Sequence, residues 1–265
     1  MSDKLSKIKR AIFVPIYLLS CLTMSSDRLS GYWGDNGTVA VLLKFIAVFA
    51  SVFVVGMINR DAPVYLAKAH KWVIVTVSVL IVADILFFNI SGSVYLRRII
   101  WIAYVFAAET ALYLSVSTAP ESDEKDIFYS EFWKWFSPLY VFTFLICFVR
   151  APFSVRTINL IPLNGTFLML KAFVKNINVS FEAPILFFGN LLIFAPLPFV
   201  LKRIFGNITN KQIIAVGVLT PFFVEGYQYL FKCGDVDIDD IIFNIAGFLI
   251  GYLIFNKHQK RALAK

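Results

Sequence analysis

Charged residues are scarce in this chain, and that scarcity excludes most soluble folds. Only 16% of the 265 residues are Asp, Glu, Lys or Arg, whereas a soluble domain averages about 25%. Hydrophobic residues make up 59%, and the mean hydropathy is +0.75. Because the apolar residues gather in long runs, we predict an all-α polytopic membrane protein, in which helices satisfy their own backbone hydrogen bonds in lipid.

Cysteines are equally few. The three present, Cys21, Cys147 and Cys233, have no metal or redox spacing such as C-x-x-C. An odd number of cysteines, two of them inside apolar runs, does not support a disulfide framework. The fold must therefore depend on helix packing.

Eight apolar segments are candidates to cross a membrane as helices. Crossing about 30 Å of hydrocarbon takes roughly 20 residues. The first segment is short, contains Pro15 and follows several basic residues without a clear cleavage site, so we interpret it as an uncleaved helix. The predicted spans are residues 11–24, 38–58, 72–88, 99–117, 133–149, 184–201, 212–230 and 240–256.

The placement of Lys and Arg predicts that both termini are cytoplasmic. With eight spans, the segments on the N-terminal side of the membrane carry about twice as many Lys and Arg as those on the other side. Membrane proteins concentrate these residues inside. Flanks of membrane helices also account for the net charge of +8, so we predict no nucleic-acid partner. The expected location is the cell membrane.

A long acidic polar stretch at residues 118–131 divides the chain. No internal repeat is found, so the inverted-repeat pattern of many transporters is missing. The predicted domains are a four-span module at 1–128, a second membrane domain at 129–257 and a basic cytoplasmic tail at 258–265.

One helix is predicted to lie at the outer surface instead of crossing the membrane. Around residues 165–178, apolar side chains recur at helical spacing, while Lys171 and Lys175 lie off that face. The segment is too short to span, which favours an interfacial or re-entrant helix. An ordinary connecting helix is the alternative.

Polar residues from five segments of the second half fall at one level, the outer leaflet and its surface. Glu225 and Gln228 share one helical face, and Asp237, Asp240 and Asn244 share another. Ionisable groups at the edge of hydrocarbon are costly, so a functional role is their default interpretation. The predicted ligand-binding residues are Arg156, Asn159, Asn190, Glu225, Gln228, Asp237, Asp239, Asp240 and Asn244.

The aspartates also suggest a divalent cation. Asp237, Asp239 and Asp240 are candidate metal ligands, because hard oxygen atoms suit Mg²⁺ or Ca²⁺. The EF-hand spacing fails, since position six counted from Asp235 is Asp240 and not glycine. Other positions are assigned to packing: the prolines Pro162 and Pro196, and the G-x-x-x-G pair Gly247 and Gly251, which permits close helix approach.

Four motifs resemble the VanZ family of membrane proteins. They are R-x-x-N-L-I-P at 156–162, G-N-L-L-I-F-A-P at 189–196, E-x-x-Q at 225–228 and D-I-D-D-I-I-F-N-x-x-G at 237–247, in the family's order. The chain departs from the family pattern in two places: the segment Lys232, Cys233 and Gly234 lacks the Arg that the family often has there, and Pro198 stands near a usual Gly. The resemblance implies a link to resistance against teicoplanin, whose target is a peptidoglycan precursor outside the cell.

Binding of an envelope ligand is the first of three functions that the sequence leaves open. The ligand would be a membrane lipid carrying a glycan, an anionic glycan or a peptidoglycan precursor, with Arg156 contacting phosphate or carboxylate. The second function is an enzyme acting on such a lipid through its carboxylates. Its weakness is that no G-x-S-x-G, H-E-x-x-H or Ser–Lys motif lies outside, and both histidines are predicted inside. Catalytic residues therefore stay unknown.

A transporter is the third function. Lys44, Asp84 and Glu109 lie in predicted spans and would act as charge relays. Lys44 and Asp84 have similar predicted depth, so an ion pair between them would lower the cost of both charges.

Overall fold

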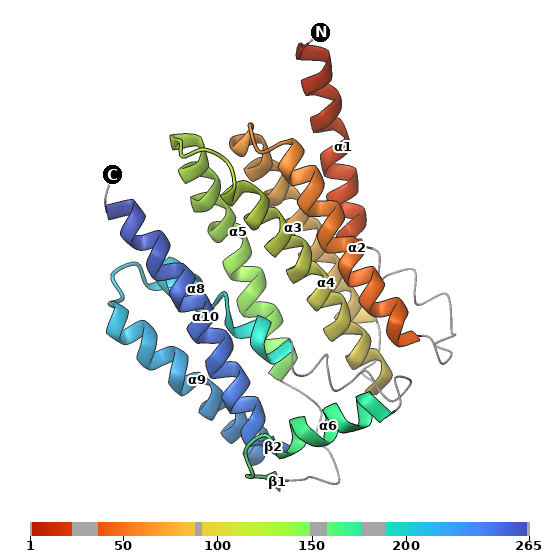
Figure 1. The fold of residues 1–265 in the computed structure, drawn as a ribbon, viewed down its shortest axis with the longest axis vertical. Coiled ribbons are helices and arrows are strands. Elements are labelled where there is room, and N and C mark those ends of the chain that lie inside the picture. Colours follow the sequence, from red (N-terminus) through yellow and green to blue (C-terminus); the bar gives the residue numbers. More distant parts are fainter. Residues whose placement is uncertain (1, 23–36, 88–91, 149–157, 176–188, 264–265) are drawn as a thin grey trace. The chain divides into compact units, whose positions relative to one another are not determined.

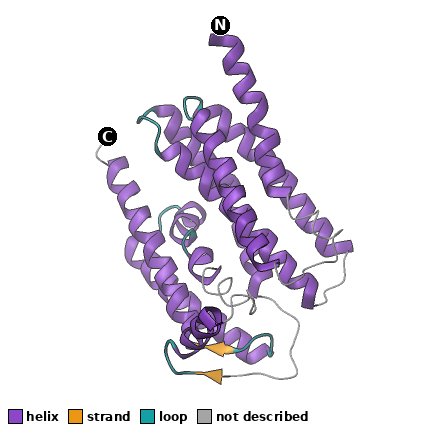
Figure 2. Cartoon of the chain, turned by 45° about the vertical axis from the view of Figure 1, so that its right-hand side comes forward, coloured by secondary structure: helices purple, strands orange, loops and turns teal. Residues whose placement is uncertain are grey.

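The fold is described from a computed structural model for residues 2–22, 37–87, 92–148, 158–175 and 189–263. The predicted all-α class is confirmed, since these residues are almost entirely helical apart from two strands of two residues each (Figure 2). The chain forms two compact units, Met1–Leu139 and Tyr140–Lys265. Their division lies inside a helix, and the domain boundary at 128/129 stays a prediction.

The first unit is a bundle of long helices. Helices α1 to α4 run side by side along a common direction (Figure 1), and α2 packs most extensively on α4. A Cβ atom on Gly56 of α2 would lie 2.2 Å from Ser115 Oγ of α4, so this glycine sets their close approach. The helices are α1 (Ser2–Leu22), α2 (Gly37–Ile58), α3 (Pro63–Phe87), α4 (Gly92–Ser117) and the start of α5 (Asp123–Phe148).

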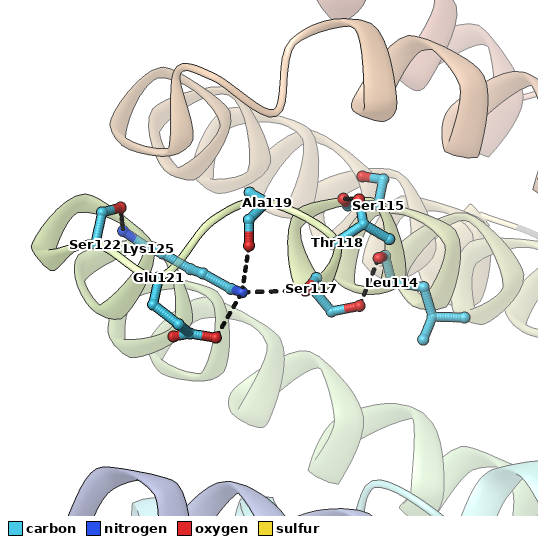
Figure 3. A network of polar contacts seen from close by, with 8 residues as sticks. All are labelled: Leu114, Ser115, Ser117, Thr118, Ala119, Glu121, Ser122 and Lys125. Atoms are coloured by element: carbon cyan, nitrogen blue, oxygen red, sulfur yellow. Dashed lines mark hydrogen bonds and ion pairs between the residues drawn. The ribbon is translucent and has the colours of Figure 1, made fainter. Parts of the chain in front are cut away.

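A buried lysine closes the turn from α4 to α5. The last carbonyls of a helix lack intrahelical partners. Lys125 Nζ donates to the carbonyls of Ser117 at 3.0 Å and Ala119 at 2.7 Å, and it pairs with Glu121 at 3.0 Å (Figure 3). The cation also suits the negative end of the helix dipole. Lys125 thereby fixes the start of α5 against the end of α4.

The second unit is built on α9 (Asn210–Phe231) and α10 (Ile238–Leu263), with α8 (Leu197–Phe205) packed on both. A capping box between Thr209 and Gln212 begins α9. Three short elements gather where α9 meets α10: β1 (Ile158–Asn159), β2 (Val236–Asp237) and α6 (Asn164–Lys175) (Figures 1 and 2). The two strands pair in parallel, with Ile158 opposite Val236 and Asn159 opposite Asp237.

Four helices in the described part of the chain are long and apolar enough to cross a membrane. They lie in α3, α4, α9 and α10, over Pro63–Leu86, Ile100–Ser117, Asn210–Phe231 and Ile238–Gln259. The apolar part of α2, Leu43–Ile58, is shorter. The predicted total of about eight spans stays a prediction. A helix is confirmed at the start of the predicted segment 165–178, where Phe167 and Leu168 of α6 are exposed.

The predicted span 184–201 is wrong as a single helix. In its described part, residues 189–194 are helical, Ala195 and Pro196 form a turn, and α8 begins at Leu197. Pro196 and Pro198 have no N–H to continue the helical hydrogen bonds, although proline is tolerated in the first turn of a new helix. The chain therefore breaks and restarts at this point.

Glycines of α10 allow its backbone to touch the segment 189–195. A Cβ atom on Gly247 would lie 2.0 Å from the carbonyl oxygen of Leu191, and one on Gly251 would lie 1.9 Å from that of Ala195. Gly247 and Gly251 are four residues apart in α10, and Leu191 and Ala195 are four residues apart in the facing segment. Two successive helical turns of α10 therefore meet two successive turns of that segment. No side chain larger than hydrogen fits at these positions without moving backbone.

Replacing Gly247 by Ala should therefore separate α10 from its neighbour. We expect Gly247→Ala to lower the free energy of unfolding by about 1–3 kcal/mol, as overpacking of a filled core does. The matched control is Gly226→Ala in α9, where nothing lies within 4 Å of an added Cβ and alanine favours the helix. Thermal unfolding in detergent micelles measures both. Equal midpoints for the two variants would contradict the proposed contact.

Candidate functional site

The site lies in the turn that joins α9 to α10. Lys232 ends α9 in a left-handed conformation, with φ +56°, and its N–H donates to the carbonyl of Gln228. The N–H of Cys233 donates to the same carbonyl at 3.1 Å. Asp239 and Asp240 then stand in the first turn of α10, where the helix dipole favours negative charge. We call Asp237, Asp239 and Asp240 the aspartate cluster.

Asp239 holds the start of α6. Its Oδ1 accepts a hydrogen bond from the backbone N–H of Leu163, and its Oδ2 accepts from the N–H of Thr166 at 3.0 Å and from the Thr166 hydroxyl at 2.9 Å. The first N–H groups of a helix have no intrahelical acceptor. A carboxylate from α10 therefore caps α6, and Asp239 is only 4% exposed.

Asp237 joins the two strands to α9. Its Oδ1 accepts from Asn159 Nδ2 at 3.0 Å and from the N–H of Asp239 at 2.9 Å, while its own N–H donates to Glu225 Oε2 at 3.3 Å. The parallel register of β1 and β2 places Asn159 opposite Asp237. Burial raises the pKa of the Asp237 carboxyl, and the negative charge of Asp239 adds to the rise, while the hydrogen bonds to Oδ1 oppose it.

The third aspartate contacts the opposite side of the site. Asn190, in the helical segment 189–194, donates through Nδ2 to Asp240 Oδ1 at 2.5 Å. One turn further along α10, Asn244 is 1% exposed, and its Oδ1 has no hydrogen-bond partner among the residues described. A buried amide oxygen of this kind is costly unless a water or ligand reaches it.

The structure thus brings together most of the residues that the sequence predicted. Asp237 is hydrogen-bonded to Asn159, Glu225 and Asp239, and Asn190 is hydrogen-bonded to Asp240. Buried Gln228 packs under the turn, 2.8 Å from where a Cβ of Gly234 would lie. Arg156 lies outside the described residues. Pro162 is exposed just before α6, and Pro196 is in the turn that precedes α8.

A metal ion is less well supported than a hydrogen-bonding ligand. No group of three or more His, Cys, Asp or Glu side chains in the described ranges is arranged to hold one. Asp237, Asp239 and Asp240 are directed to three different partners, and Asp239 uses both oxygens on α6. The divalent-cation site at these aspartates stays a prediction from the sequence.

Two residues of the site, Gly165 and Thr166, were not predicted from the sequence. Thr166 binds Asp239, and a Cβ on Gly165 would lie 3.1 Å from Asp237 Oδ2 and 3.3 Å from Asp239 Oδ2. The run Asn164–Gly165–Thr166 at a helix start is a capping signal that could have indicated them.

The first unit also has a charge partner that the sequence did not indicate. Asp84 accepts from Arg98 Nε at 2.6 Å, and Arg98 Nη2 donates to the Asp84 carbonyl at 3.0 Å. The ion pair of Asp84 with Lys44 stays a prediction. Asp84 lies near the end of α3, and Arg98 lies near the start of α4. Spacing within one helix cannot indicate a partner on the next helix.

Comparison with known proteins supports the motif resemblance. The model of the VanZ/LLP1 family matches residues 128–259, the half that contains the aspartate cluster. No curated protein and no solved structure matches the chain.

The first prediction at this site concerns the cap of α6. Asn at position 239 has only one acceptor oxygen, so Asp239→Asn leaves the N–H of Leu163 or Thr166 without a partner. We expect a local loss of about 1–3 kcal/mol, seen as faster backbone hydrogen exchange in residues 163–168. The control is Asp235→Asn, because Asp235 is exposed. Unchanged exchange in Asp239→Asn would rule out the cap.

The second prediction concerns pH. The raised pKa of Asp237 means that the folded state binds this proton more tightly than the unfolded state, where Asp titrates near 3.9. Its stabilising effect is complete below about pH 4 and is lost as the pH rises through the folded-state pKa. Asp237→Asn keeps Oδ1 and stays neutral. From pH 4 to 7, the melting temperature of the parent should therefore fall relative to that of the variant. If the melting temperature of the parent rose relative to that of the variant over this range, the pKa of Asp237 would be lowered in the folded state and not raised.

Proposed function

We propose that the C-terminal half of this chain, taken as a member of the VanZ/LLP1 family, binds the glycan headgroup of a lipid of the cell envelope. The apolar helices make the chain a membrane protein, and the family suggests a link to the envelope or to antibiotic resistance. The observation that carries the proposal is the convergence of polar side chains from five chain segments on the turn between α9 and α10.

Acceptor atoms dominate the described part of the site, which favours a ligand rich in hydroxyl and N–H groups. Asp237 Oδ1 is occupied by Asn159 and Asp239, whereas Oδ2 borders Gly165. The Oδ1 of Asn244 is buried without a partner among the described residues. Hydrogen bonds from sugar hydroxyls to a carboxylate are charge-assisted and therefore stronger than neutral ones. A glycan suits these acceptors better than a simple anion would.

Arg156 supplies the phosphate contact in this proposal. It stands two residues before β1 in the sequence, and its guanidinium offers a planar fork of donors that matches phosphate. A lipid-linked glycan carries both groups, hydroxyls for the aspartate cluster and a phosphate for the arginine. The predicted topology puts this end of α9 and α10 at the outer leaflet, where a peptidoglycan precursor is exposed.

The test compares two lipid probes on purified protein in lipid nanodiscs. One probe is a lipid-linked peptidoglycan precursor, and the other is the same carrier lipid with phosphate and no sugar. Asp237→Asn should weaken binding of the first probe about tenfold or more, because a hydrogen bond to a charged group contributes about 1.5–3 kcal/mol. It should leave the second probe unaffected. Arg156→Ala should weaken both.

Matched controls separate these effects from general changes in charge. Asp235→Asn removes one exposed negative charge near Asp237, and Arg203→Ala removes an exposed positive charge of α8 near the opposite end of α9. Both should bind like the parent. Binding at parental strength by Asp237→Asn and Arg156→Ala together would overturn the proposal. Release of free sugar or phosphate, abolished by Asp240→Asn, would replace binding by catalysis.

A further inference from the structure

Three ionisable side chains meet in the interior of the first unit, away from the aspartate cluster. Tyr17 comes from α1, His70 from α3 and Glu109 from α4, and none is more than 1% exposed. The His70 ring stacks on Phe132 of α5, with ring centroids 4.5 Å apart. Four helices thus enclose the group.

The contacts of this triad are direct. The Tyr17 hydroxyl donates to Glu109 Oε1 and lies 3.2 Å from His70 Nδ1. His70 Nδ1 lies 2.9 Å from Glu109 Oε2. On the other side of the ring, His70 Nε2 lies 3.2 Å from the carbonyl oxygen of Phe132.

These distances fix the number of protons. A carbonyl oxygen only accepts, so Nε2 carries a hydrogen that it donates to Phe132. In a neutral imidazole, Nδ1 is then a bare acceptor, and it faces a carboxylate oxygen that also only accepts. Without another proton, Glu109 Oε2 would be a buried oxygen with no hydrogen-bond partner. One proton between Nδ1 and Oε2 removes that conflict.

The same proton removes a buried charge. With it, the pair is neutral overall, either as carboxylic acid with imidazole or as carboxylate with imidazolium. Without it, one negative charge remains in an apolar bundle, which is costly. The titratable side chains that the structure places against Glu109 are Tyr17 and Cys21 from α1 and His70 from α3. Each of these is neutral or belongs to the pair.

We infer that Tyr17, His70 and Glu109 form a proton-binding site, in which one exchangeable proton is shared between His70 Nδ1 and Glu109 Oε2. Buried carboxyl and imidazole groups of this kind hold and pass protons in membrane proteins. Tyr17 fixes the carboxyl by its bond to Oε1, and Phe132 fixes the imidazole tautomer. The inference concerns the first unit only and does not depend on glycan binding by the second.

The chain makes the proton directly observable. His70 and His258 are its only histidines, and His258 lies in α10, outside the triad. Nitrogen NMR of ¹⁵N-histidine-labelled His258→Gln protein in nanodiscs therefore reports on His70 alone. We expect a protonated Nε2 and an Nδ1 engaged with a proton. A bare Nδ1 or a bare Nε2 would overturn the site.

Exchange with solvent distinguishes a proton site from a static structural bond. After transfer to D₂O, the infrared bands of the His70–Glu109 pair should shift before the backbone amides of α3 and α4 exchange. The shift should disappear in Glu109→Gln, whose amide donates to Nδ1 but has no acidic proton. Tyr17→Phe should change the Nδ1 resonance, whereas Tyr65→Phe should not, because Tyr65 donates to the Arg10 carbonyl instead. Exchange that only follows the amides would overturn the inference.

Discussion

The polar end of the second unit depends on the carboxylate of Asp239, which connects the start of α10 to the start of α6. It belongs to the first turn of α10 and caps α6, which begins more than 70 residues earlier in the chain. Because a helix start has N–H groups without acceptors, the hydrogen bonds from Asp239 help to hold α6 in position. Once α6 is fixed, Gly165 lies against Asp237 and closes one side of the aspartate cluster.

Close backbone contact supports this polar end from within the helical layer. Gly247 and Gly251 let α10 touch the carbonyls of Leu191 and Ala195. The same contact brings Asn190 to the level of Asp240, where the two side chains form a hydrogen bond. Packing and chemistry are therefore coupled in this unit, since a shift of α10 by a small fraction of a turn would separate Asn190 from its acceptor.

The two units satisfy buried polar groups in different ways. In the first, two buried acidic side chains have a side-chain partner on a neighbouring helix, Asp84 with Arg98 and Glu109 with His70. In the second, carboxylates bind backbone N–H groups and amide side chains. Pairing of ionisable side chains lowers the cost of charge in a closed interior, whereas carboxylates with spare acceptor capacity suit an external ligand. This contrast is the physical basis for assigning proton binding to one unit and ligand binding to the other.

The sequence by itself determined the helical class, the resemblance of the C-terminal half to the VanZ family and the set of polar residues that could act together. Hydropathy and helical phase indicate on which face of its own helix each residue lies. Asp237, Asp240 and Asn244 could therefore be grouped from their spacing alone. The tertiary structure decided the partners: Asp239 with Thr166, Asp84 with Arg98, and His70 with Glu109. It also decided the pairing of β1 with β2. These features depend on distances between segments far apart in the chain, and periodicity within a segment contains no information about such distances.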